Sequence, residues 1–214
     1  MSIPNLFHPG VEIIFDHFQD LSIIQQEQFR QLGIIYQEWN AKLNLVSRKD
    51  LPNLYLRHVL HALSIAKLVQ FKAGTQVLDV GTGGGFPGIP LAIFFPQAQF
   101  HLVDSIAKKM HAVQVIVEVL GLKNVKTQVV RAEHLAEKYD FILGRAVTDL
   151  ALFYNWVKDK IVAISMHTIE NGILYLKGGD DPIQIKQPYH IYKLNDFLKD
   201  PFFETKQLIH VPIN

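Results

Sequence analysis

The chain has 214 residues, of which 49% are hydrophobic and 19% are charged, a balance that excludes disorder and fibrous repeats. Its 21 Lys and Arg nearly cancel its 20 Asp and Glu, so a nucleic-acid partner has to be met by a local patch of cations. The chain contains no cysteine, which excludes disulfide scaffolds, thiolate zinc sites and cysteine nucleophiles. The first ten residues lack the basic start and apolar core of a signal peptide. No uncharged apolar run reaches the roughly 18 to 20 residues of a membrane span, so we expect a cytoplasmic protein without membrane contact.

The first part of the chain is predicted to be helical. Ser22 and Gln25 stand three positions apart, as in a capping box. A second apolar stripe runs from Leu56 to Leu68 and stops before Gly74. We therefore expect a helical lobe over residues 1–73, followed by a larger domain over residues 74–214. The apolar row that follows the capping box has helical spacing and consists of Ile24, Phe29, Leu32, Ile35, Trp39 and Leu43.

After Gly74, short apolar runs alternate with helical stretches. Nearly continuous Val, Ile and Leu in these runs indicates strands covered on both faces, and the alternation predicts a doubly wound parallel sheet. Residues 185–194 and 206–211 alternate apolar and polar side chains, which predicts two antiparallel strands at one edge. The expected fold class is therefore α/β, mostly parallel with an antiparallel C-terminal edge. The predicted parallel strands are 76–80, 99–104, 125–131, 139–143 and 172–176, and the predicted helices are 87–95, 106–120 and 150–164.

A glycine-rich loop, residues 79–90 (DVGTGGGFPGIP), lies between the first predicted strand and the next helix. Glycines there permit a sharp turn and a close approach of backbone to a ligand, and N–H groups at the helix start favour an acceptor-rich group. Gly83, Gly85 and Gly88 match the dinucleotide pattern G-x-G-x-x-G. Asp104 follows where that pattern places a ribose-binding acid. The loop is therefore compatible with an NAD-dependent oxidoreductase.

The same loop also matches the acid-x-G-x-G-x-G pattern of S-adenosylmethionine sites, through Asp79, Gly81, Gly83 and Gly85. Both cofactors contain adenosine, so an acid at Asp104 serves either. An acid beside the loop can hold the cationic amino group of methionine, whereas it would repel a pyrophosphate. This favours S-adenosylmethionine, while a glycine-rich turn without a ligand stays an alternative.

The residues at the end of the fourth predicted strand and just after it limit which chemical groups could accept a methyl group. Residues 141–146 read FILGRA, without the Asn/Asp-Pro-Pro-aromatic strip of amine methyltransferases or the paired glutamates of protein arginine methyltransferases. A ring nitrogen with an in-plane lone pair, such as guanine N7, needs no general base, and in-line transfer then depends on positioning and electrostatics. Arg145 is predicted to lie over the cofactor crevice, where it can hold a carboxylate or phosphate or lie against a purine. An exposed loop arginine is the alternative.

Other charged residues are weaker candidates. Ala132 and Glu133 follow the third predicted strand and are placed to meet the adenine edge, although Glu133 also suits a plain helix start. His58 and His61 lack a third ligand, so we expect no metal site. The candidate RNA contacts, each of which could also be a solvated surface charge, are Arg57, Lys108, Lys109 and Lys177.

Residues 79–90 and several shorter motifs, taken in order, resemble the bacterial small-subunit rRNA guanine-N7 methyltransferases, the RsmG or GidB family. The resemblance covers about residues 36 to 180. It departs from the family pattern at His61-Ala62, where Asp-Ser is common, and at Gly144, where a serine usually precedes Arg-Ala. The shorter motifs are Asn44-Leu45 with Ser47, Arg57-His58, Asp104-Ser105, Lys108-Lys109, Glu133, Arg145-Ala146 and Lys177-Gly178.

The resemblance implies a Rossmann-like methyltransferase that acts on a guanine N7 of 16S rRNA with S-adenosylmethionine as cofactor. It implies cofactor contacts at Gly81, Phe86, Ala132, Glu133 and Arg145. The combined hypothesis is that Asp79 and the glycine loop hold the methionine end, Asp104 the ribose, and Glu133 with Ala132 the adenine, while Arg145 acts as the catalytic residue between cofactor and substrate. The expected partner is 16S rRNA or the small subunit, and the expected state is a monomer. A non-catalytic RNA-binding assembly factor stays a further alternative.

Overall fold

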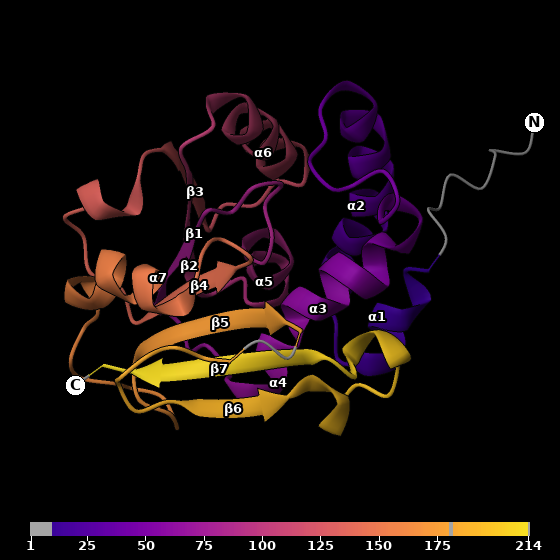
Figure 1. The fold of residues 1–214 in the computed structure, drawn as a ribbon. Coiled ribbons are helices and arrows are strands. Elements are labelled where there is room, and N and C mark those ends of the chain that lie inside the picture. The colour runs from indigo at the N-terminus through magenta and orange to yellow at the C-terminus, as the bar shows by residue number, and fades with distance from the viewer. Residues whose placement is uncertain (1–9, 180–181, 214) are drawn as a thin grey trace, which may run out of the picture.

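The computed structural model describes residues 10–179 and 182–213, in which a mixed sheet of seven strands forms the centre of the fold (Figure 1). The strand order is β3-β2-β1-β4-β5-β7-β6. The first five strands pair in parallel, whereas β7 pairs antiparallel with both β5 and β6. This confirms the predicted α/β class and its antiparallel C-terminal edge. The strands are β1 (Gln76–Val80), β2 (Gln99–Asp104), β3 (Val125–Val129), β4 (Phe141–Arg145), β5 (Gly172–Gly178), β6 (His190–Lys193) and β7 (Lys206–Pro212).

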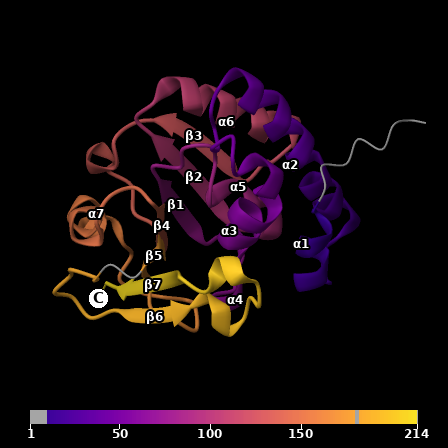
Figure 2. The same ribbon diagram turned by 45° about the vertical axis from the view of Figure 1, so that its right-hand side comes forward.

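The α-helices cover both faces of the sheet (Figures 1 and 2). A π-helix over Tyr55–Leu60 precedes α3, and short 3₁₀ turns occupy Leu51–Asn53, Ala132–His134, Lys158–Lys160, Leu194–Asp196 and Pro201–Phe203. The α-helices are α1 (Glu12–His17), α2 (Ile23–Lys42), α3 (His61–Leu63), α4 (Ile65–Leu68), α5 (Gly88–Phe94), α6 (Ala107–Val119) and α7 (Leu150–Val157).

Two apolar clusters occupy the two faces of the sheet. Successive residues of a strand point to opposite faces, so Val77 joins the larger cluster and Leu78 the smaller one. The larger cluster contains buried side chains of α2, α3, α5 and α6, and the smaller one lies beneath α7 through Phe153 and Val157. The N-terminal helices therefore share their core with the sheet. The division of the chain at residue 73 stays a prediction, and residues 1–9 of the predicted lobe lie outside the described residues.

The start of α2 confirms the predicted capping box. The Ser22 hydroxyl accepts a hydrogen bond from the Gln25 N–H at 3.3 Å, and Gln25 Oε1 accepts one from the Ser22 N–H at 2.9 Å. Phe29, Leu32 and Ile35 are buried as expected. Ile24, the first residue of the predicted apolar row, is 72% exposed, because Gln25 is the residue of this first turn that faces α5, donating to the carbonyls of residues 93 and 94.

The helix predicted over 150–164 is too long. The α-helix ends at Val157 and a 3₁₀ turn reaches Lys160. The chain then runs beside the sheet, where the Tyr139 N–H donates to the carbonyl of Lys160 at 2.8 Å and the Val162 N–H donates to the carbonyl of Tyr139 at 2.9 Å. These bonds compete with the helical ladder. Likewise, only 190–193 of the predicted strand 185–194 pairs with β7.

This topology brings the carboxyl ends of the parallel strands together at one edge. Ligands of open α/β sheets bind at that edge, where the strand order reverses between β1 and β4. Within residues 10–179 and 182–213, no helix is long and apolar enough to cross a membrane.

Candidate cofactor site

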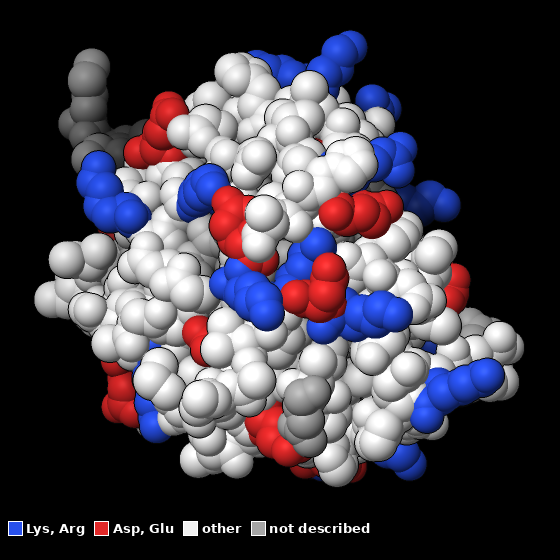
Figure 3. All heavy atoms as spheres, turned by 90° about the vertical axis from the view of Figure 1, so that its left-hand side faces the viewer, with Lys and Arg blue, Asp and Glu red and all other residues white. Residues whose placement is uncertain are grey.

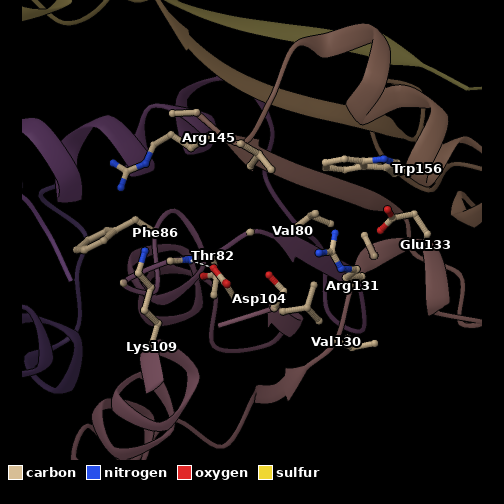
Figure 4. A pocket seen from close by; sticks show the side chains of 18 of the residues that line it. Val80, Thr82, Phe86, Asp104, Lys109, Val130, Arg131, Glu133, Arg145 and Trp156 are labelled. Carbon is tan, nitrogen blue, oxygen red and sulfur yellow. Dashed lines mark hydrogen bonds between the residues drawn. The ribbon is translucent and has the colours of Figure 1, made fainter. Parts of the chain in front are cut away.

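A cavity of about 380 Å³ opens at the carboxyl ends of β1, β2 and β4 (Figure 4). Its size falls in the range of small-molecule sites. The residues that line it are spread over positions 45–156 of the sequence. They are Leu45, Val80, Gly81, Thr82, Gly83, Gly84, Phe86, Val103, Asp104, Ser105, Lys109, Val130, Arg131, Ala132, Glu133, Arg145, Ala146, Val147 and Trp156.

Hydrogen bonds hold the glycine loop against its neighbours. The Gly83 N–H donates to Asp104 Oδ2 at 2.9 Å, which ties the loop to the end of β2. On the other side, the Tyr36 hydroxyl donates to the carbonyl of Gly84 at 2.5 Å. Gly81 and Gly83 have φ angles of +64° and +59°, a region that favours glycine. The loop is therefore a preformed cradle whose backbone faces the cavity.

The helical part of the chain contributes one wall of this cradle. A Cβ atom on Gly84 would lie 2.7 Å from the carbonyl oxygen of Leu45, so only glycine allows this contact. Asn40 fixes that segment, because its Oδ1 accepts hydrogen bonds from the N–H groups of Leu45 at 2.9 Å and Val46 at 3.0 Å. Leu45 thus reaches the cavity from a position far from the loop in sequence.

The structure places Asp79 beneath the loop rather than in the cavity. Its side chain is fully buried, and Oδ2 accepts hydrogen bonds from the Thr82 hydroxyl at 2.6 Å and the Gly88 N–H at 2.8 Å. Burial raises the pKa of the Asp79 carboxyl to about 7, against the lowering effect of those hydrogen bonds. In this position Asp79 supports the loop, and direct contact with a methionine amino group stays a prediction.

Arg145 and Phe86 form one end of the cavity (Figure 4). The Arg145 guanidinium lies 5.1 Å from the centre of the Phe86 ring, and its Nη2 donates to His58 Nδ1 at 3.2 Å. Burial and the neighbouring Arg145 lower the pKa of His58 to about 3, so the imidazole is neutral and accepts this bond. Burial also lowers the pKa of Arg145, to about 10, which still leaves the guanidinium charged at neutral pH.

Within residues 10–179 and 182–213, the Arg145 cation forms no ion pair, although the charges of Asp79 and Asp50 act on it from beyond ion-pair distance. A half-buried cation whose hydrogen-bond partner is neutral is incompletely compensated and favours an anionic group nearby. This end of the cavity is therefore suited to a carboxylate or a phosphate.

Glu133 and Trp156 lie at the opposite end (Figure 4). Glu133 belongs to the 3₁₀ turn Ala132–His134 after β3, and Trp156 comes from α7. Between the two ends, Asp104 lines the cavity at the end of β2, and its Oδ1 accepts a hydrogen bond from the Ile106 N–H at 2.9 Å. The cavity thus offers an acid and an indole at one end, a carboxylate in the middle and a cation at the other end.

The predicted site residues fall into two groups. The first group lines this cavity: Gly81, Gly83, Phe86, Asp104, Lys109, Ala132, Glu133 and Arg145. The second group lies elsewhere. Asp79 is beneath the loop, and Gly85 packs against Ile89 and Tyr36 at a φ of +92°. Arg57 forms an ion pair with Asp50 at 2.6 Å, Lys108 is exposed outside the lining, and Lys177 lines an adjacent cavity.

The sequence did not single out several lining residues. Trp156 stands in an apolar helix, where an aromatic residue predicts core packing, and Arg131 follows a strand as an ordinary charge. The sequence offers His58 as a metal ligand, as a nucleic-acid contact beside Arg57 and as part of a family motif, whereas the structure shows it bonded to Arg145, 87 positions away. No local pattern marks contacts of that range.

Charges around the site are of both signs. On the face drawn in Figure 3, Lys and Arg side chains lie among Asp and Glu side chains without forming a patch of one sign. In the described ranges, no group of three or more His, Asp or Glu is placed to hold a metal ion.

Comparison with known proteins places these features in a family. The chain matches GidB, rRNA small subunit methyltransferase G, over residues 25–205. It is 53% identical to the ribosomal RNA small subunit methyltransferase G of Flavobacterium psychrophilum, over 95% of this chain and 98% of that protein. It is 50% identical to the protein of the same name from Cytophaga hutchinsonii, over 94% of this chain and 99% of that protein.

A solved structure supports the fold at low sequence identity. A mutant of MtNAS in complex with S-adenosylmethionine superposes with a TM-score of 0.58 at 15% identity, over 94% of this chain and 82% of that chain. That likeness shows the fold alone. From the family match and the nearly full-length relatives, the chain belongs to the GidB family of rRNA small subunit methyltransferases G.

Proposed function

We propose that this protein methylates N7 of a guanine in 16S rRNA, with S-adenosylmethionine as the methyl donor. The observation that carries the proposal is the cavity over the glycine loop, with the half-buried Arg145 cation at one end and Glu133 and Trp156 at the other. The relatives over nearly the whole chain are named as small-subunit rRNA methyltransferases, which supports the substrate class.

The residues of the cavity fit the proposed cofactor. Arg145 and the Gly81–Gly83 backbone would hold the methionine end, because a carboxylate there would complete a desolvated cation. Asp104 would accept hydrogen bonds from the ribose hydroxyls, and Ala132 with Glu133 would meet the adenine. A Cβ atom on Gly83 would meet only the carbonyl of Gly81, at 3.8 Å, so the open space above this residue can admit a ligand.

The cofactor supplies a methyl group on a sulfonium for in-line displacement. Guanine N7 offers a lone pair in the ring plane and carries no proton, so the chain needs no general base. The contribution of the protein is then to fix the angle and distance of approach and to shape the local electrostatics. Phe86 and His58 support this by holding the Arg145 guanidinium in one place.

We also propose that the helical lobe over residues 1–73 completes the site of the domain over residues 74–214, because Leu45 and His58 reach it from the helical part. Lys109 in the cofactor cavity and Lys177 in the adjacent one are the better placed of the candidate RNA contacts. Arg57 already pairs with Asp50. A monomeric state and a cytoplasmic location stay predictions.

Radiolabelled methyl transfer onto small-subunit particles that lack the modification, followed by nucleoside analysis, tests the proposal. We expect label in 7-methylguanosine of 16S rRNA. Label in another nucleoside would contradict the N7 assignment. RNA binding without any incorporated label would favour the non-catalytic assembly factor, and calorimetric binding of NADH without binding of S-adenosylmethionine would favour the oxidoreductase.

A further inference from the structure

A second cavity, of about 410 Å³, adjoins the cofactor cavity. Ala146 lines both, so the two cavities are neighbours on either side of the residue just beyond the end of β4. The second cavity lies over the carboxyl end of β5 and the start of α7, and its lining consists of Ala146, Thr148, Asp149, Leu150, Tyr175, Leu176, Lys177, Gly178, Pro182, Ile183 and Gln184.

The partition between the two cavities is rigidly held. Ala146 has a φ of +53°, a conformation that residues with a side chain rarely adopt. The Tyr175 hydroxyl accepts hydrogen bonds from the N–H groups of Val147 at 3.2 Å and Thr148 at 3.3 Å, and donates to the carbonyl of Thr148 at 2.5 Å. A strained residue that the surroundings hold in place is typical of functional sites. The junction is therefore a fixed point at which two ligands can meet.

The lining of the second cavity combines apolar walls with two charged side chains. Leu150, Leu176 and Ile183 offer surfaces on which the flat face of a base can pack. Asp149 lines this cavity and not the first one, and its Oδ1 accepts a hydrogen bond from the Leu152 N–H at 2.9 Å as the cap of α7. A carboxylate can accept several hydrogen bonds, so this cap leaves acceptor capacity for a ligand. Lys177 adds a cation on the same side of the partition.

We infer that the second cavity receives the acceptor guanine, turned out of its RNA stack, and that Asp149 reads its Watson–Crick edge. This inference rests on the proposed function and names the group that selects the base. The N1–H and N2–H groups of guanine are donors that a carboxylate accepts, whereas adenine presents an acceptor at N1. N7 lies on the Hoogsteen edge, on the far side of the ring system from the 2-amino group, so the base can face the Ala146 junction with N7 while Asp149 holds the N1–H and N2–H groups.

The extruded base also explains why the cavity carries both signs of charge. Enzymes that modify a base act on single-stranded RNA or turn the base out of its stack, and they read its exposed edge in a pocket. Asp149 would bind the base, and Lys177 would bind the phosphate next to it. The first cavity then holds the donor and the second cavity holds the acceptor.

A double-mutant cycle between the enzyme and its substrate tests this inference. The substrate is a small-subunit particle in which the guanine that becomes methylated is replaced by inosine, which lacks only the 2-amino group. The enzyme variant is Asp149→Ser, because serine preserves the helix cap while removing the carboxylate. Asp200→Ser is the matched control, since Asp200 also caps a short helix and lines neither cavity.

We expect the wild-type protein to lose roughly tenfold in kcat/KM when inosine replaces guanine, as for a hydrogen bond to a charged group. Asp149→Ser should lose at least as much with guanine and show no further loss with inosine, with S-adenosylmethionine binding unchanged. Asp200→Ser should behave as wild type. A full inosine penalty in Asp149→Ser, or an equal loss of S-adenosylmethionine binding, would overturn the inference. A wild-type protein that transfers no methyl group to a guanine would instead remove the proposed function and this inference with it.

Discussion

Arg145 is the residue in which stability and function conflict most clearly. Its guanidinium is desolvated, yet its recorded contacts are a neutral imidazole and an aromatic ring. Replacing a half-buried cation that forms no ion pair costs little stability, because the desolvation penalty of the charge disappears with it. Because desolvation of the guanidinium costs free energy, the presence of Arg145 at this position is best explained by binding of a ligand.

Arg145→Met should therefore reduce methyl transfer without unfolding the protein. We expect kcat/KM to fall by about 100-fold, the usual effect of losing one electrostatic contact in an active site. The free energy of unfolding, measured with urea, should change by less than about 1 kcal/mol or increase. Arg30→Met, at an arginine of α2 that pairs with Glu27 at 3.7 Å, serves as a control with normal transfer. Unchanged transfer in Arg145→Met would remove its assigned role.

Asp79 predicts a pH-dependent stability of defined sign. Because burial raises its pKa from 3.8 to about 7, the folded protein binds this proton more tightly than the unfolded chain between about pH 4 and 7. Asp79 therefore makes the free energy of unfolding fall as the pH rises through that window, by up to about 1.4 kcal/mol per pH unit. Asp79→Asn should lack this contribution, so its stability relative to wild type should rise up to about pH 7 and then level off. Parallel curves for the two proteins would contradict the shift.

Among the elements, side chains of α7 and β5 pack so closely on β4 that Gly144 has no room for a side chain. A Cβ atom there would lie 2.7 Å from ring atoms of both Phe153 and Tyr175. The resemblance described in the sequence analysis leads us to expect a serine at this place, and in this chain the two rings that meet over Gly144 leave no room for one. The same tyrosine fixes the partition between the two cavities.

Gly144→Ala should destabilise the protein by about 1 to 3 kcal/mol, as overpacking of a filled core does. Gly178→Ala, in the same strand, is the matched control, because its Cβ would meet only the flexible end of Lys206 at 3.2 Å. Urea unfolding of both variants measures the difference. Equal free energies of unfolding for the two variants would contradict the prediction, because they would show that the two rings can move to admit a methyl group.

The elements themselves were largely readable from the sequence. The strands 76–80 and 99–104 have the predicted bounds, because apolar runs between glycine or proline residues have few alternatives. Helix ends were less readable, since the ladder of α7 yields after Val157 to hydrogen bonds with Tyr139, which lies elsewhere in the sequence. Ile24 begins the apolar row and yet is exposed, because helical spacing identifies a face but not the turn at which that face begins to be covered.

At the scale of the whole molecule, five buried or half-buried histidines have lowered pKa values, and their effect on the pH dependence of stability is opposite in sign to that of Asp79. Burial is the main cause of their lowered pKa values. Below about pH 6.5 the unfolded chain therefore binds more protons at these histidines than the folded protein does. Stability from these groups is present above that pH and is lost as the pH falls through 6.5 towards the lowered pKa values. The histidines are His58, His61, His101, His167 and His210.

His61 tests this acid sensitivity, because it is buried among Phe202 and Phe203. Between pH 6.5 and 4.5, His61→Leu should lose less of its free energy of unfolding than the wild-type protein does. The exposed His134 gives the control His134→Leu, whose profile should follow that of wild type. If His61→Leu keeps the wild-type slope, His61 does not contribute to acid unfolding.

Part of the candidate site could be predicted from the sequence, because it depends on the predicted order of strands and helices. The glycine loop, Asp104 and Arg145 lie at the carboxyl ends of β1, β2 and β4, which are neighbours in the sheet. The topology of a parallel sheet gathers such positions at one edge. Trp156 and His58 join the site through contacts over long sequence distances, which no local pattern records. The inward orientation of Asp79 follows from the path of the loop, and its residue type alone does not reveal it.

A crystal structure of the protein with S-adenosylmethionine tests the central claim most directly. We predict the donor in the cavity at the ends of β1, β2 and β4, with its carboxylate at Arg145, its ribose at Asp104 and its adenine between Ala132 and Trp156. The sulfonium methyl should point to the Ala146 junction. An empty cavity at saturating ligand, or a donor bound elsewhere on the protein, would contradict the account.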